Sequence, residues 1–137
     1  MRLHAVAAGP KEAPVVVLLH GFPEFWYSWH RQLEPLAAAG FRVIVPDQRG
    51  YNQSSKPRGV RSYSLTELVS DVIAIADQLG KRQIFLAGHD WGAAVAWSAA
   101  LSHPERIAKL AILNVPHPSV MRRFLMSNRR QMRRSWY

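Results

Sequence analysis

The chain has 137 residues, of which 48% are hydrophobic and 20% charged, and its formal net charge is +9. These values predict one globular domain that is long enough to bury a core, and they exclude a disordered tail. The chain has no cysteine, which excludes disulfides, thiolate metal sites and cysteine nucleophiles.

The positive charge is unevenly distributed along the chain. Residues 1–116 hold 12 basic and 9 acidic side chains, whereas residues 119–137 hold six arginines and no acidic residue. The longest aliphatic run, Val15–Leu19, is far too short to span a membrane, and the N-terminal residues lack an apolar signal core. We therefore expect a cytoplasmic protein without a membrane span.

Strand and helix patterns alternate along the chain, which predicts an α/β fold with a mostly parallel sheet flanked by helices. The run Val15–Leu19 is entirely apolar, as in a strand that is covered on both faces. The other expected strands are an incomplete one at Leu3–Ala7, then Phe41–Val45, Gln83–Ala87 and Ile107–Leu113.

Three helices are expected between these strands. The first, Trp29–Ala39, should be broken at Pro35, because proline lacks the backbone N–H that a helix interior needs. The second begins at the capping box Ser64–Glu67 and ends before Gly80. The third, Ala93–Ser102, is built of small residues that permit close approach to the sheet.

The pentapeptide Gly88-His89-Asp90-Trp91-Gly92 lies between an expected strand and an expected helix. Glycines at both ends suit a turn so sharp that a side chain there would collide with backbone, while the central Asp90 is pushed outward. A carboxylate is a poor nucleophile toward an ester or amide, but it can open a strained ring or displace a leaving group at saturated carbon. The alternative interpretation is an aspartate that caps the following helix. The pentapeptide alone does not decide whether Asp90 is a nucleophile or a helix cap.

Two further motifs follow expected strands. His20-Gly21-Phe22-Pro23-Glu24 comes directly after Val15–Leu19, and Asp47–Pro57 follows the next strand. Either motif alone is compatible with an ordinary strand-ending turn. Because the carboxyl ends of parallel strands meet at one edge of a sheet, all three motifs are expected to converge on a single crevice.

These residues resemble the α/β-hydrolase superfamily, and specifically its soluble epoxide hydrolase branch. The resemblance extends over essentially the whole chain, which is incomplete at its C-terminus by comparison with that fold. It rests on five segments: His20–Glu24, Trp26–Trp29, Asp47–Pro57, Gly88–Gly92 and Asn114–Pro118.

The resemblance implies roles for individual residues. Asp90 would be the nucleophile that forms an alkyl-enzyme ester, and the backbone amides of Phe22 and Trp91 would form the oxyanion hole. The peptide bond between Phe22 and Pro23 would be cis. Asn52 replaces a common glycine, a change that asparagine tolerates because it accepts positive φ. The supporting motif residues are His20, Gly21, Pro23, Gly88, His89 and Gly92.

Related dehalogenases are the nearest alternatives. Haloalkane dehalogenases share the His-Asp-Trp-Gly run, and the tryptophan matching Trp91 donates its indole N–H to halide. They usually have a polar residue where this chain has Phe22, and a phenyl ring cannot hold halide. Fluoroacetate dehalogenases place arginine where this chain has Trp91. The expected reaction is therefore the opening of a small apolar epoxide to a diol with water, with no cofactor and no metal.

In this superfamily a cap, an acid and a histidine follow the nucleophile. No histidine of the chain is convincing as the base that activates water; His103, for example, should lie about 15 Å away at the far end of a helix. We expect residues 1–118 to be the N-terminal part of the core and residues 119–137 a basic helical segment leading into a missing cap. Alone, the chain should not catalyse repeated turnover of an epoxide.

The basic segment 119–137 has apolar residues near helical spacing, with arginines on the other face. One interpretation is a non-catalytic fragment whose tail binds an anionic membrane or nucleic acid. We favour a solvated lead-in to the cap and expect no nucleic-acid partner, because six arginines without a nucleic-acid-binding fold are weak support. Tyr137 resembles a cap tyrosine that protonates the leaving oxygen, and an ordinary aromatic residue is the alternative.

Overall fold

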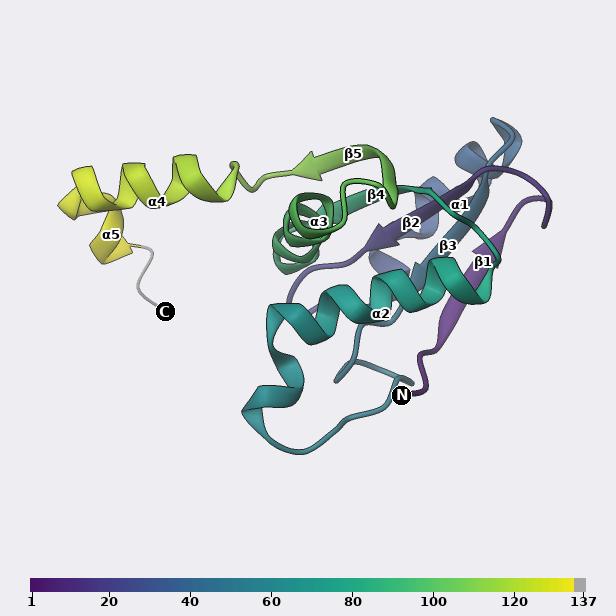
Figure 1. Ribbon diagram of the computed structural model, residues 1–137, viewed down its shortest axis with the longest axis horizontal. Coiled ribbons are helices and arrows are strands. Elements are labelled where there is room, and N and C mark those ends of the chain that lie inside the picture. Colours follow the sequence, from purple (N-terminus) through teal and green to yellow (C-terminus); the bar gives the residue numbers. More distant parts are fainter. Residues whose placement is uncertain (135–137) are drawn as a thin grey trace.

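The computed structural model describes residues 1–134 (Figure 1). Five strands form one sheet in the order β1-β3-β2-β4-β5. Strands β2 to β5 run parallel to one another, and β1 pairs antiparallel with β3 at one edge. The strands are β1 (Ala5–Ala8), β2 (Val15–Leu19), β3 (Arg42–Pro46), β4 (Ile84–His89) and β5 (Ile107–Leu113).

Helices cover both faces of this sheet. Helix α1 lies on one face, and α2 and α3 lie side by side on the other (Figure 1). Helices α4 and α5 extend away from the body beyond β5 (Figure 1). The helices are α1 (His30–Ala38), α2 (Leu65–Gln78), α3 (Trp91–Ser102), α4 (Pro118–Ser127) and α5 (Arg129–Arg134), with 3₁₀ turns at Trp26–Trp29 and Val60–Tyr63.

Strand β2 lies at the centre of two apolar layers. Val15, Val17 and Leu19 belong to the core between the sheet and helices α2 and α3. Val16 and Leu18 point the other way, into the core beneath α1. Successive side chains of a strand point to opposite faces, so an unbroken apolar run suits a strand that is covered on both sides. The prediction that the run Val15–Leu19 forms a strand covered on both faces is confirmed.

Helix α1 differs from the expectation, because it continues through Pro35. The ring removes one backbone donor, but Leu33 packs into the core and Leu36 lies against it. The carbonyl of Pro35 still accepts the N–H of Ala39. Tertiary packing of the apolar face therefore outweighs the loss of one hydrogen bond, and the predicted break was wrong.

Helix α2 begins as the capping box predicts, since the Ser64 hydroxyl accepts the backbone N–H of Glu67. The Glu67 side chain does not return to the cap; it accepts a hydrogen bond from Arg49 instead. The helix ends before Gly80, which adopts a φ of 64°. Ser64 thus caps the helix as expected, whereas Glu67 connects α2 to the loop after β3.

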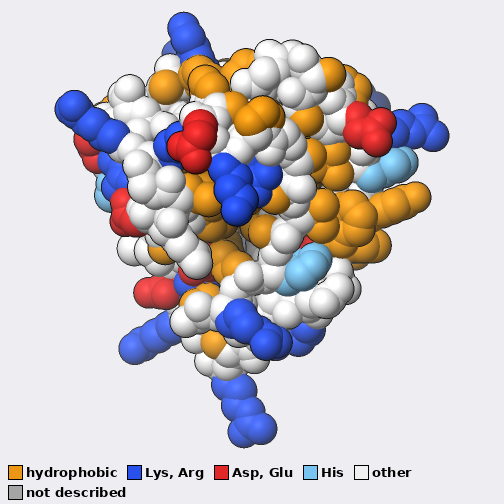
Figure 2. All heavy atoms as spheres, turned by 90° about the vertical axis from the view of Figure 1, so that its right-hand side faces the viewer, with side chains coloured by type: hydrophobic (Ala, Val, Ile, Leu, Met, Phe, Trp, Pro, Cys, Tyr) orange, Lys and Arg blue, Asp and Glu red, His pale blue; other side chains and the backbone are white. Residues whose placement is uncertain are grey.

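The charge pattern of the sequence is visible on the surface. At the end of the body opposite α4, basic and acidic side chains are scattered among apolar ones without a patch of one sign (Figure 2). On α4, by contrast, Val120, Met121 and Phe124 are exposed beside arginines. Within residues 1–134, none of the helices has the length and apolarity needed to cross a membrane.

Candidate active site

Four loops meet where the parallel strands end. His20 follows β2, Asp47 follows β3, Asp90 follows β4 and Asn114 follows β5. Hydrogen bonds link the first loop to the second and the third to the fourth. This carboxyl edge of an open parallel sheet is where such folds bind ligands.

Asp90 lies in a sharp turn between β4 and α3, with φ 52° and ψ −121°. A Cβ atom on Gly88 would overlap the backbone of Gly92, and one on Gly92 would overlap the carbonyls of Leu19 and His20. Non-glycine residues rarely adopt positive φ, so the surroundings must hold this conformation. The turn therefore requires both glycines, as the sequence predicts.

The Asp90 carboxylate points toward the loop after β2. Its Oδ1 accepts the backbone N–H of Phe22 at 3.0 Å, and the Phe22–Pro23 bond is cis as expected. Trp91 is the first residue of α3, so its N–H has no acceptor within the helix. The side chains of Phe22 and Trp91 are 64% and 56% exposed. The residue whose amide binds the carboxylate and the residue that follows Asp90 thus both have exposed apolar side chains.

His20 is fully buried and holds two loops together. Its Nδ1 donates to the carbonyl of Gly21 at 2.9 Å, and its Nε2 accepts the N–H of Gln48 at 3.0 Å. Burial is the main cause that lowers the pKa of the imidazole; the Gly21 carbonyl and the charges of Asp47 and Glu24 oppose it. His20 is thus a neutral structural residue, in keeping with its predicted supporting role.

Asp47 is also fully buried, and its carboxylate accepts three hydrogen bonds. Oδ1 accepts the N–H of Trp26 at 2.9 Å, while Oδ2 accepts from His4 at 2.7 Å and from Asn52 at 2.9 Å. Asn52 adopts a φ of 40°, in line with its expected tolerance of positive φ. Asp47 holds the N-terminal segment and two loops in place.

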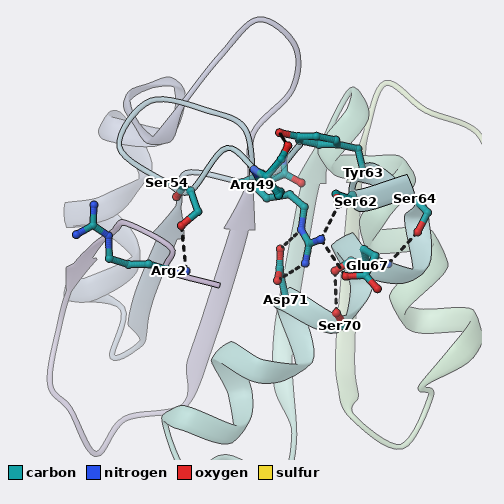
Figure 3. Close-up of polar contacts among 12 residues, drawn as sticks. Arg2, Arg49, Ser54, Ser62, Tyr63, Ser64, Glu67, Ser70 and Asp71 are labelled. Carbon is teal, nitrogen blue, oxygen red and sulfur yellow. Dashed lines mark hydrogen bonds and ion pairs between the residues drawn. The ribbon is translucent and has the colours of Figure 1, made fainter. Parts of the chain in front are cut away.

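Arg49 anchors the same loop to α2. Its guanidinium forks onto both carboxylate oxygens of Asp71, at 2.6 and 2.7 Å, and also reaches Glu67 (Figure 3). The hydrogen bonds with Asp71 are the main cause that raises the pKa of Arg49. The Asp47–Pro57 motif therefore supports the site by holding its own loop against α2. The backbone N–H of Gln48 in this motif already donates to His20.

Tyr51 packs its ring edge against His20, with ring centroids 4.8 Å apart. Burial first, and then the nearby Asp90 carboxylate, raise the pKa of this phenol. The tyrosine thus borders the space around Asp90.

The contacts described for the six histidines do not include the Asp90 carboxylate. His20 and His89 hold loops together, His4 contacts Asp47, and His103 pairs with Glu105 at the far end of α3. His117 contacts Ser119 and packs against Trp97. His30 stacks on Tyr27.

Tyr137, the predicted acid, lies outside the described residues. Among residues 1–134, no cluster of three or more His, Asp or Glu could hold a metal ion.

Sequence reasoning missed two residues beside Asp90. Glu24 accepts the N–H of Gly21 at 3.0 Å, and Asn114 accepts the N–H of Asp90 at 3.0 Å. Both belonged to motifs used for the resemblance, but neither was given a function. Asn114 pairs with Asp90, and Glu24 also contacts His89, so each has a partner that is distant in sequence and that spacing along the chain could not reveal.

The alpha/beta hydrolase fold family has a model that matches residues 14–135. This chain belongs to the alpha/beta hydrolase fold family. Within it, an AB hydrolase superfamily protein of Bacillus subtilis is 52% identical over 120 residues, which are 88% of this chain and 42% of the relative. Epoxide hydrolase B of Mycobacterium tuberculosis is 53% identical over 117 residues, 84% of this chain and 33% of that protein.

Solved hydrolases show the same similarity in three dimensions. Epoxide hydrolase A from Mycobacterium thermoresistibile superposes with a TM-score of 0.83 at 43% identity, over 92% of this chain and 42% of that one. The chain spans between a third and about two fifths of the length of these relatives. The predicted family and its epoxide hydrolase branch are supported by these similarities.

Proposed function

We propose that this chain supplies the nucleophile and the oxyanion-binding amides of an enzyme that opens epoxides to diols. The observation that carries the proposal is the Asp90 carboxylate, presented on a sharp turn and hydrogen-bonded to the Phe22 amide. The relatives named epoxide hydrolase support the substrate class.

In the first step, a carboxylate oxygen of Asp90 attacks a ring carbon of the epoxide. A C–O bond forms, the ring C–O bond breaks, and the departing oxygen takes a proton from an acid. In the second step, water attacks the carboxyl carbon of the ester. The backbone N–H groups of Phe22 and Trp91 stabilise the resulting oxyanion, whose collapse releases the diol and regenerates Asp90.

An epoxide fits this site better than a haloalkane does. A departing halide needs polar donors, whereas the exposed side chain next to the carboxylate on the first loop is the apolar ring of Phe22. The exposed indole of Trp91 favours haloalkane cleavage as the second candidate, since its N–H can donate to halide. Both substrate classes react through an ester of Asp90. The two activities are therefore distinguished by their products, a diol from an epoxide and free halide from a haloalkane.

We further propose that residues 1–118 are the part of the hydrolase core that carries Asp90, and that residues 119–137 lead into a cap. Exposed apolar side chains on α4, which include Val120, Met121 and Phe124, support a surface that another segment covers. Because no histidine contacts Asp90 among the described residues, we expect the 137-residue chain to form the ester but not to release diol repeatedly.

The test is covalent labelling of the 137-residue chain. The chain is incubated with an aryl epoxide, and intact-mass and peptide mass spectrometry locate any adduct. We expect one adduct per chain, on Asp90, and no more than about one diol released per chain. Loss of the adduct in Asp90→Asn, with the variant still folded, would support the assignment.

Asp77→Asn is the matched control, because Asp77 is an exposed carboxylate on α2 that should not react. An adduct that forms equally in Asp90→Asn, or no adduct at all in the unmodified chain, would contradict the proposal. Release of halide from a chloroalkane, without reaction of the epoxide, would favour the haloalkane alternative instead.

A further inference from the structure

A series of hydrogen bonds leads from the backbone of Asp90 to the loop after β2. The N–H of Asp90 donates to Oδ1 of Asn114 at 3.0 Å, and Nδ2 of Asn114 lies 3.3 Å from Nε2 of His89. Nδ1 of His89 lies 3.3 Å from Oε2 of Glu24, which also accepts the N–H of Gly21 at 3.0 Å. We call Glu24, His89 and Asn114 the Asp90 relay.

The donors and acceptors of the relay fit only one arrangement of protons. A backbone N–H can only donate, so Oδ1 of Asn114 must face Asp90 and its NH₂ group must face His89. Nε2 of His89 is then an acceptor, and Nδ1 carries the proton that is donated to the Glu24 carboxylate. The relay therefore requires Oε2 of Glu24 to act as an acceptor and His89 to carry its proton on Nδ1.

The relay connects the three loops that surround the proposed nucleophile. Glu24 lies on the loop after β2, His89 at the end of β4 and Asn114 on the loop after β5. Asn114 adopts a φ of 62°, a conformation that asparagine tolerates better than most residues. Glu24 binds the amide of Gly21, while the next amide, that of Phe22, binds the Asp90 carboxylate. Both ends of the relay thus lie next to the reacting group.

Asp90 has a backbone conformation that its own residue type disfavours. The orientation of the peptide group between His89 and Asp90 determines where the Asp90 carboxylate points. The relay fixes that peptide group through the Asp90 N–H. It also fixes the Gly21 amide, and with it the direction of the Phe22 amide.

We infer that Glu24, His89 and Asn114 are positioning residues, which hold the Asp90 backbone and the Phe22 amide in the geometry needed for alkylation. This inference rests on the proposed function of Asp90. None of the three touches the substrate or the reacting atoms; they act through the orientation of Asp90. Their removal should lower the rate of ester formation more than it weakens epoxide binding.

Four variants separate positioning from general stability. Asn114→Gly removes the side chain but accepts the positive φ, so the backbone is not strained. Glu24→Ala removes the acceptor, whereas Glu24→Gln keeps an oxygen where both donors point. Glu105→Ala is the matched control: it breaks a His–Glu contact of 3.6 Å at the far end of α3.

The first readout is the rate of Asp90 alkylation as a function of epoxide concentration. We expect Asn114→Gly and Glu24→Ala to lower the maximal rate constant about tenfold, as for one lost hydrogen bond in the transition state. The half-saturating epoxide concentration should change less than about twofold. Glu24→Gln and Glu105→Ala should stay close to the unmodified chain. An unchanged maximal rate in Asn114→Gly and Glu24→Ala would overturn the inference.

The second readout does not depend on catalysis. Nitrogen NMR of the imidazoles should show His89 as the neutral Nδ1–H tautomer at neutral pH, and Glu24→Ala should abolish that preference while Glu24→Gln keeps it. Exchange of the Asp90 amide proton should accelerate in Asn114→Gly. If the unmodified chain is not alkylated, the proposed function fails, and this readout still decides the relay: an Nε2–H or charged His89, or unchanged exchange, would refute it.

Discussion

Two aspartates follow neighbouring parallel strands, and their surroundings give them opposite properties. Asp47, after β3, is fully buried and accepts from Trp26, His4 and Asn52. Asp90, after β4, accepts one described hydrogen bond, from Phe22, through its carboxylate. A buried carboxylate that three donors hold in place fixes loops, whereas one with a single donor keeps lone pairs free to react. The number of donors, and not the residue type or its place after a strand, separates the two.

The largest expected effect tests Asp47 against Asp90 by the same substitution. Asp47→Ala should lower the free energy of unfolding by about 3 kcal/mol, because it removes a buried acceptor that serves part-buried donors of His4, Trp26 and Asn52. Asp90→Ala should cost less than about 1 kcal/mol, since its single hydrogen bond lies at the surface. Urea unfolding measures both. Similar losses in the two variants would break the comparison.

A second prediction concerns the backbone of the Asp90 turn. Asp90→Gly should be more stable than Asp90→Ala by about 1 to 2 kcal/mol, because both variants lack the carboxylate and only glycine accepts a φ of 52° without strain. Thermal unfolding of the two variants gives the difference. Asp47, which does not adopt positive φ, should show no preference of this kind for glycine. Equal stability of Asp90→Gly and Asp90→Ala would mean that the turn stores no strain.

The smallest expected effect is a pH dependence from His20, which connects the loop after β2 to the loop that carries Asp47. Burial lowers the pKa of His20 in the folded chain, so the unfolded chain binds the proton more readily. The stabilisation is therefore complete above the unfolded value of about 6.5 and is lost as the pH falls below it, by at most about 1.4 kcal/mol per pH unit. Urea unfolding between neutral and mildly acidic pH measures this slope. His20→Gln, whose side-chain oxygen can still accept from Gln48, should have a shallower slope; an unchanged slope would assign the pH dependence to other groups.

Much of the fold could be predicted because its signals are local. The apolar run Val15–Leu19, the cap at Ser64 and the small residues of α3 each specify an element from a few neighbouring residues. The expectation of a break at Pro35 was wrong because it, too, used only local signals. A local rule gave the cost of the proline, but the burial of Leu33 and its neighbours came from the sheet.

For the site, the sequence by itself determined which residues stand in the turn: the two glycines that a tight approach requires, and the aspartate between them. Only the tertiary structure decided what each polar group does. Asp47 became a structural carboxylate, His20 a neutral buried support, and Glu24 and Asn114 partners of the Asp90 turn. The physical reason is that a glycine turn is decided by sterics within a few residues. The donors and acceptors around a carboxylate, by contrast, come from loops that are distant in sequence and meet only when the strands form one sheet.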